Sequence, residues 1–105
     1  MAKQMVYTAR NIKADEALRI GLVNAVYPLA ELYAAAEKLA SQIAANAPIA
    51  VRAAKKAINE GLDLPMDEAV VVEEKAFGSC FETADQQEGM GAFLEKRKHE
   101  PFINK

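Results

Sequence analysis

The stretch that organises this chain is its last helix-like segment, residues 83–98, which read TADQQEGMGAFLEKRK. Thr83 is followed three residues later by Gln86, and this spacing is typical of a capping box at the start of a helix. The residues that then recur at helical spacing are Met90, Phe93, Leu94 and Arg97. This pattern predicts a helix with one apolar face that ends in a cationic turn. We interpret the residues upstream as the platform on which this helix sits.

Length and composition fit one globular domain over residues 1–105. The chain is 51% hydrophobic and 27% charged, which is enough for a modest core. Its net charge of -2 argues against nucleic-acid binding, because such domains usually carry a basic excess. No apolar run approaches the roughly 20 residues that span a bilayer, and the first residues lack a secretory signal pattern. We therefore expect a cytoplasmic protein with neither nucleic acid nor a membrane as partner.

Helix signals along the chain predict an all-α fold, a small helical bundle of four main helices plus short N-terminal helical pieces. The short pieces cover residues 2–10 and 13–21, and residues 22–27 are an extended connector or a very short strand. The main helices cover residues 29–46, 48–60, 65–81 and 83–98. Particular residues predict where the helices begin and end. Pro48 and Pro65 suit helix starts, Gly21 suits a left-handed stop, and Gly61 suits a helix end.

Few side chains qualify for catalysis or metal binding. Cys80 is the only cysteine, so an intramolecular disulfide and a cysteine zinc cluster are both excluded, and we interpret it as a small buried apolar residue. His99 is the only histidine and lies near an end that is expected to fray. Glu82, Asp85 and Glu88 surround the start of the last helix, where acids favour the helix dipole. We predict no catalytic residue and no metal site.

The basic turn formed by Lys96, Arg97 and Lys98 has two interpretations. In the first, it is a solvated turn that complements the negative end of its own helix. In the second, it is an anion site, because Phe93 lies one helical turn before Lys96 or Arg97. An aromatic ring and an ammonium would then face the same ligand. An adenine nucleotide that carries a phosphate would use both, through stacking and a charge-assisted hydrogen bond.

Five sequence blocks carry a resemblance to a known family. They are YTAR at 7–10, ADEALRIGLVN at 14–24, NAPIA at 46–50, KKAIN at 55–59 and EGMGAFLEKRK at 88–98. Together, and in this order, they resemble the C-terminal part of the enoyl-CoA hydratase (crotonase) superfamily over essentially the whole chain. The resemblance is closest to the short-chain enoyl-CoA hydratases, also called 3-hydroxybutyryl-CoA dehydratases.

The resemblance implies a C-terminal fragment of a longer lyase of fatty acid metabolism, which reversibly hydrates 2-enoyl-CoA to 3-hydroxyacyl-CoA. In that family an N-terminal spiral domain supplies the oxyanion hole and two glutamates, so we expect the fragment itself to be inactive. Met1 would then lie inside a longer protein, which would explain the missing cap ahead of Ala2. The acyl-CoA thioester is the substrate, and no cofactor is implied. The helical region would form trimers or hexamers and help cover the acyl-CoA.

Motif matching implies three substrate-binding residues. Phe77 and Phe93 would line the region near the fatty-acyl or CoA moiety, and Lys96 would approach the CoA 3′-phosphate. The superfamily also contains isomerases and hydrolases, which this region does not separate. The alternative from another class is a free-standing helical protein-interaction module without catalysis. Apolar helix faces without a covering domain also predict that the chain self-associates.

Overall fold

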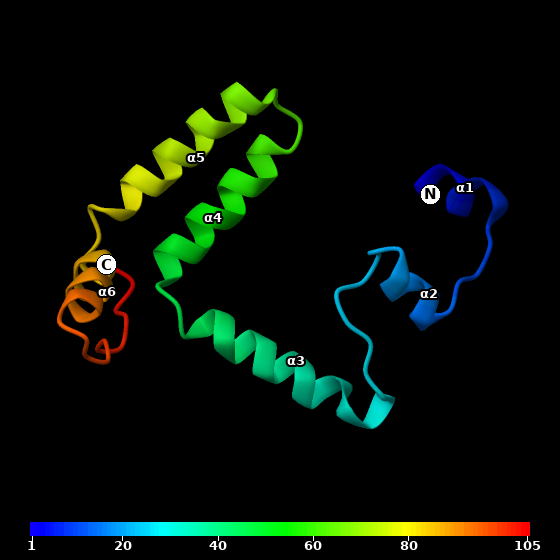
Figure 1. Cartoon of the computed structure of the whole chain (residues 1–105), viewed down its shortest axis with the longest axis horizontal. Coiled ribbons are helices and arrows are strands. Elements are labelled where there is room, and N and C mark those ends of the chain that lie inside the picture. Colours follow the sequence, from blue (N-terminus) through cyan, green and yellow to red (C-terminus); the bar gives the residue numbers. More distant parts are fainter. The chain divides into compact units, whose positions relative to one another are not determined.

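The computed structural model describes residues 1–105 and contains six helices and no strand (Figure 1). The helices are α1 (Ala2–Thr8), α2 (Ala14–Arg19), α3 (Leu29–Ala44), α4 (Pro48–Gly61), α5 (Met66–Cys80) and α6 (Ala84–Leu94). The predicted all-α class, with four main helices and short N-terminal ones, is confirmed. The segment at 22–27 forms no strand, so it is the connector of the two alternatives. None of the helices combines the length and apolarity that a membrane crossing requires.

The helix starts follow the residue types that predicted them. Pro48 is the first residue of α4, and Pro65 directly precedes α5. The hydroxyl of Thr83 accepts the backbone N–H of Gln86 at 3.1 Å, which caps α6. The second bond of a capping box is not made, because the backbone N–H of Thr83 donates to the carbonyl of Cys80 at 3.1 Å. Thr83 is therefore a simple N-cap.

The chain divides into two compact units, residues 1–37 and 38–105, and the boundary falls within α3. The single domain expected over residues 1–105 stays a prediction. In the first unit the carboxylate of Glu16 binds Arg10 at 2.8 Å and Arg19 at 3.7 Å. These ion pairs are exposed at the surface, and pairs of that kind contribute little to stability.

The end of α2 is a Schellman motif, in which two backbone N–H groups close the last turn. The N–H of Leu22 donates to the carbonyl of Ala17 at 2.9 Å, and the N–H of Gly21 donates to the carbonyl of Leu18 at 3.1 Å. Gly21 has a φ of 73°, in the left-handed region that glycine enters without steric cost. The prediction that Gly21 stops this helix is therefore confirmed.

In the second unit, α4 and α5 lie side by side and are joined by a short turn (Figure 1). Gly61, which we expected to close a helix over residues 48–60, is the last helical residue of α4, and its φ is not positive. A Cβ added there would lie 3.4 Å from the Cβ of Ala69 on α5, which is ordinary van der Waals contact. Gly61 therefore packs directly against α5 at the closed end of this hairpin, next to the turn that joins the two helices.

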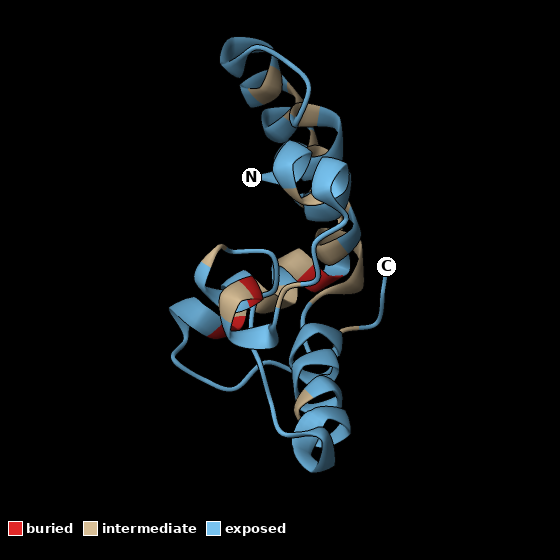
Figure 2. Ribbon diagram, turned by 90° about the vertical axis from the view of Figure 1, so that its right-hand side faces the viewer, coloured by how far each residue is buried: buried red, intermediate tan, exposed pale blue.

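Very few side chains of this chain are buried, and most of the ribbon in Figure 2 has the exposed colour. Ala17 and Ala92 are the only buried apolar residues, and Asp85 is the only buried polar one. The predicted apolar stripe of α6 is present in the sequence but is not buried, since Phe93 is 77% exposed and Leu94 is 73% exposed. Large apolar side chains are normally enclosed in a folded domain. The helices therefore present apolar faces that the chain itself does not cover.

Candidate functional site

An apolar groove with a volume of about 880 Å³ lies between α4, α5 and α6. Most side chains that α4 contributes to its wall are alanines, whereas larger ones come from α5, α6 and the C-terminal segment. Representative lining residues are Ala50, Ala54, Val70, Phe77, Met90 and Phe102. Grooves of this size and character take an apolar part of a small molecule or an apolar helix face.

Phe77, the first of the three predicted binding residues, lies in this groove. Its ring meets the ring of Phe81 edge-on, with the centroids 5.1 Å apart. The side chain is 66% exposed, so only part of it is taken up by packing. An edge-to-face arrangement is a favoured geometry for two aromatic rings. Phe77 therefore offers a partly exposed apolar surface at the groove.

Phe93 and Lys96 lie outside the groove, and they do not share a helical face. We predicted a common face from a helix that continued to residue 98, but α6 ends at Leu94. Lys96 has a φ of 56°, in the left-handed region, so the chain turns away at this residue. The spacing of one helical turn between the two residues is therefore lost. No residue type marks a helix end here, because residues 95–98 are good helix formers.

The end of α6 is a second Schellman motif. The N–H of Arg97 donates to the carbonyl of Ala92 at 3.0 Å, and the N–H of Lys96 donates to the carbonyl of Phe93 at 3.2 Å. Lys96 occupies the position that glycine usually takes in this motif. Its ammonium makes no ion pair within the chain, and neither does that of Lys98. Both lysines are exposed and available to an anion.

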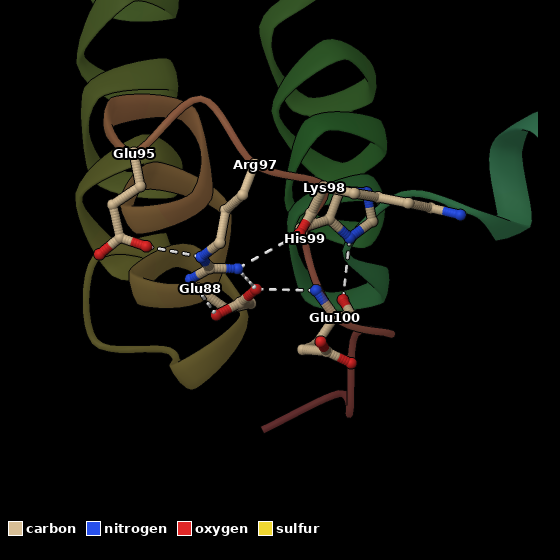
Figure 3. A network of polar contacts seen from close by, with 6 residues as sticks. All are labelled: Glu88, Glu95, Arg97, Lys98, His99 and Glu100. Carbon is tan, nitrogen blue, oxygen red and sulfur yellow. Dashed lines mark hydrogen bonds and ion pairs between the residues drawn. The ribbon is translucent and has the colours of Figure 1, made fainter.

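Arg97 is the centre of a polar network (Figure 3). Its guanidinium donates to both carboxylate oxygens of Glu88, at 2.6 and 3.1 Å, and to a carboxylate oxygen of Glu95 at 2.6 Å. Glu88 also accepts the backbone N–H of Glu100 at 2.7 Å. Arg97 is therefore engaged by two carboxylates, whereas Lys96 and Lys98 are the cations of the basic turn that make no ion pair within the chain.

The same contacts shift the ionisation of both partners. The hydrogen bond from Arg97, and after it the one from the N–H of Glu100, lowers the pKa of the Glu88 carboxyl from 4.5 to about 2. The hydrogen bonds to Glu88 and Glu95 raise the pKa of Arg97. Sequence reasoning assigned Glu88 to the helix dipole and missed this pair. No local spacing rule joins residues nine positions apart across a turn.

A second cluster fixes the C-terminal segment against the start of α6. The buried carboxylate of Asp85 accepts the backbone N–H of Ile103 at 2.7 Å and that of Asn104 at 2.9 Å. The N–H of Ala84 donates to the carbonyl of Lys105 at 2.7 Å. Arg52 of α4 donates to the side-chain oxygen of Asn104 at 2.6 Å. We name these four contacts the tail clasp.

Cys80 and His99 take structural positions. Cys80 is half-buried at the groove, and its thiol donates to the carbonyl of Ala76 at 3.4 Å. The ring of His99 stacks on Phe102, with the centroids 4.3 Å apart. Its Nδ1 lies 2.8 Å from the carbonyl oxygen of Glu100. No group of three or more acidic, histidine or cysteine side chains is arranged to hold a metal ion.

Comparison with known proteins identifies the family. Residues 1–102 match the family model described as enoyl-CoA hydratase/isomerase. This match covers nearly all of the chain, so the chain belongs to the enoyl-CoA hydratase/isomerase (crotonase) family, as the sequence blocks predicted.

The relatives include hydratases. The chain is 54% identical to the short-chain-enoyl-CoA hydratase of Clostridium acetobutylicum, over 100% of this chain and 40% of that protein. It is 53% identical to the crotonyl-CoA hydratase of Syntrophomonas wolfei, again over 100% of this chain and 40% of the relative. The crystal structure of the enoyl-CoA hydratase from Bacillus anthracis superposes with a TM-score of 0.92 and 39% identity, over 99% of this chain and 40% of that one. The chain thus spans about two fifths of the length of these relatives.

Proposed function

We propose that this chain is the C-terminal helical part of an enoyl-CoA hydratase that acts on short-chain 2-enoyl-CoA and forms 3-hydroxyacyl-CoA. Its part in that enzyme is to pack on neighbouring subunits and to cover the acyl-CoA. The observation that carries this proposal is the set of exposed apolar helix faces, with Ala17 and Ala92 as the only buried apolar residues. Exposed apolar faces of this extent are typical of surfaces that pack on another protein surface.

The three predicted residues have separate roles in this proposal. Phe77 meets the fatty-acyl or CoA moiety along the apolar groove, where its ring is held by Phe81. Phe93, which is exposed on α6, offers a second aromatic surface. Lys96 binds the CoA 3′-phosphate through its ammonium. The absence of an ion pair between this ammonium and any carboxylate of the chain supports this role.

The chemistry itself belongs to another part of the enzyme. We assign no catalytic residue, metal or cofactor to this chain, and the CoA thioester enters as the substrate. An N-terminal spiral domain carries the catalytic glutamates, and the whole enzyme is a trimer or hexamer in the cytoplasm. A purified sample of the 105 residues is therefore expected to hydrate no crotonyl-CoA and to self-associate. A strictly monomeric chain across a wide concentration range, measured by sedimentation, would contradict the packing role.

A hybrid enzyme tests the proposal directly. In this hybrid, the 105 residues replace the 105 aligned residues of the Clostridium acetobutylicum enzyme, to which they are 54% identical. We expect the hybrid to hydrate crotonyl-CoA with a kcat/KM within about tenfold of its parent, a difference of about 1.4 kcal/mol. The parent without the aligned segment is the control and is expected to be inactive.

The hybrid also separates the alternatives. A hybrid that assembles like its parent, but does not hydrate crotonyl-CoA, would overturn the proposal. That result would favour a helical interaction module without catalysis, or a segment suited to the isomerases or hydrolases of the superfamily. Light scattering checks the assembly, so that a misfolded hybrid is not counted as an inactive one.

A further inference from the structure

The conformation of Lys96 needs support from its surroundings. Its φ of 56° is unfavourable for a residue with a side chain, and such conformations persist where neighbouring contacts hold them in place. The residues on both sides of Lys96 supply these contacts, since Arg97 binds Glu95 at 2.6 Å across it. Arg97 also binds Glu88 in the middle of α6, at 2.6 Å.

The pair of Glu88 with Arg97 is incompatible with a longer helix. In a continuous helix, residues nine positions apart are separated by about 900° of rotation and so lie on opposite faces, roughly 13 Å apart along the axis. Figure 3 shows Arg97 in contact with both carboxylate oxygens of Glu88. This contact depends on the reversal of the chain at Lys96, whose φ is 56°. The tail clasp also requires the chain to reverse after α6, because it returns residues 103–105 to the start of that helix. The ion pair adds to this constraint at the turn itself and favours the turn over the helix at residues 95–98.

The three basic residues of the turn differ in their contacts. Arg97 is engaged by two carboxylates and donates to the carbonyl of Lys98 at 3.3 Å. Lys96 and Lys98 make no ion pair within the chain and are exposed. The guanidinium thus anchors the turn, while the flanking ammonium groups stay free for an anion.

We propose that Glu88 is a positioning residue which, through Arg97, holds Lys96 in the left-handed turn that presents its ammonium to a phosphate of the CoA substrate. This inference rests on the proposed function for the identity of the phosphate. Glu88 touches no substrate in this arrangement and acts only through Arg97. Its loss should therefore weaken CoA binding and leave the chemical step unchanged.

The test uses Glu88→Gln, Lys96→Ala and the double variant in the hybrid hydratase, with crotonyl-CoA and its 3′-dephospho form as substrates. We expect Lys96→Ala to raise the KM for crotonyl-CoA about tenfold, with kcat within about twofold. Glu88→Gln is expected to raise the same KM about threefold, and the double variant to match Lys96→Ala, because one residue acts through the other. The KM for the 3′-dephospho form should not change in any variant. Glu74→Gln, an exposed acid of α5 without an ion pair, is the matched control.

A second measurement follows the turn itself in the 105-residue chain. The backbone chemical shifts of residues 95–98 are expected to change from turn to helical values in Glu88→Gln and to stay unchanged in Glu74→Gln. Arg97→Lys, which keeps the charge but loses the two-pronged contact, replaces Glu88→Gln if that hybrid does not assemble, with the same expected rise in KM.

The outcomes separate the two proposals. A rise in KM for Lys96→Ala with none for Glu88→Gln, or effects that simply multiply in the double variant, would overturn the positioning role alone. An unchanged KM for Lys96→Ala would remove Lys96 from the proposed CoA site, and the positioning role with it. Unchanged shifts at residues 95–98 in Glu88→Gln would show that the turn does not depend on the pair.

Discussion

The turns that end α2 and α6 have the same backbone hydrogen bonds but different residues at the left-handed position. Each turn closes on the carbonyl of an alanine, Ala17 in the first and Ala92 in the second, and these are the two buried apolar residues of the chain. Gly21 enters the left-handed region at no steric cost, whereas Lys96 enters it at roughly 1 kcal/mol. At the second turn, contacts of neighbouring side chains accompany a left-handed lysine, whereas the first turn uses a glycine.

We expect the greatest loss of stability when the tail clasp is broken, and a tail clasp follows only the second of these turns. Asp85→Ala leaves the backbone N–H groups of Ile103 and Asn104 without their acceptor. We expect a loss of about 2–3 kcal/mol in the free energy of unfolding of the second unit, measured by urea denaturation. Fast hydrogen exchange at the two amides should accompany it.

Asp67→Ala is the matched control, because Asp67 is also an acid in the first turn of a helix but is exposed. Its cost should stay below about 0.5 kcal/mol. Equal losses for the two aspartates would mean that both act on the helix dipole only and that the tail clasp adds nothing.

The first turn is tested by Gly21→Ala. A Cβ at Gly21 meets no atom within 4 Å, so the cost is conformational and is expected to be about 1 kcal/mol. Gly78→Ala is the control, because its added Cβ also meets nothing within 4 Å but its backbone is helical, so a gain of about 0.5–1 kcal/mol is expected. Thermal unfolding followed by circular dichroism measures both. A loss of the same size in both variants would contradict the conformational explanation.

Lys96→Gly tests the second turn, and it is expected to raise the stability where Gly21→Ala lowers it. Removal of the side chain relieves the left-handed conformation, and we expect a gain of about 0.5 kcal/mol in the free energy of unfolding. Lys98→Gly, at a neighbouring lysine without a positive φ, should give no gain. In the hybrid hydratase, Lys96→Gly should still weaken CoA binding, so stability and binding are expected to change in opposite directions.

The weakest change that we expect is a conformational change at low pH that is confined to the second turn. The Glu88 pKa is lowered from 4.5 to about 2, so its contribution is present above about pH 4.5 and is lost as the pH falls towards 2. The backbone shifts of Lys96 should follow this loss, while those of Gly21 should not, since glycine needs no ion pair to keep its conformation. Movement of both turns over the same pH range would indicate general acid unfolding.

Much of the fold could be predicted from local signals in the sequence. Pro48 and Thr83 mark helix starts where the structure has them, and Gly21 marks a helix end. The end of α6 was predicted four residues too late, at residue 98 in place of Leu94. A lysine in the left-handed position gives no local signal, and the pair that stabilises it joins residues nine positions apart.

The candidate site was less predictable than the fold. The groove depends on how α4, α5 and α6 pack, and helical periodicity alone gives no information on that packing. Asp85 and Glu88 were assigned to the helix dipole, but their partners lie in the C-terminal segment, up to 19 residues away. The roles of Phe77, Phe93 and Lys96 came from family resemblance, and they stay predictions until the hybrid enzyme is measured.

The contact of Arg52 with Asn104 has a consequence for the order of folding. It joins residues 52 positions apart, whereas the bonds from Asp85 to the same segment close loops of 18 and 19 residues. Closing the longer loop costs more chain entropy, so this contact forms after the helix ends and the shorter loops. Loss of a contact that is absent from the transition state speeds unfolding and leaves the folding rate unchanged. We therefore expect loss of the Arg52 contact to shorten the time that the C-terminal segment stays in place after folding, and to leave the folding rate of the second unit unchanged.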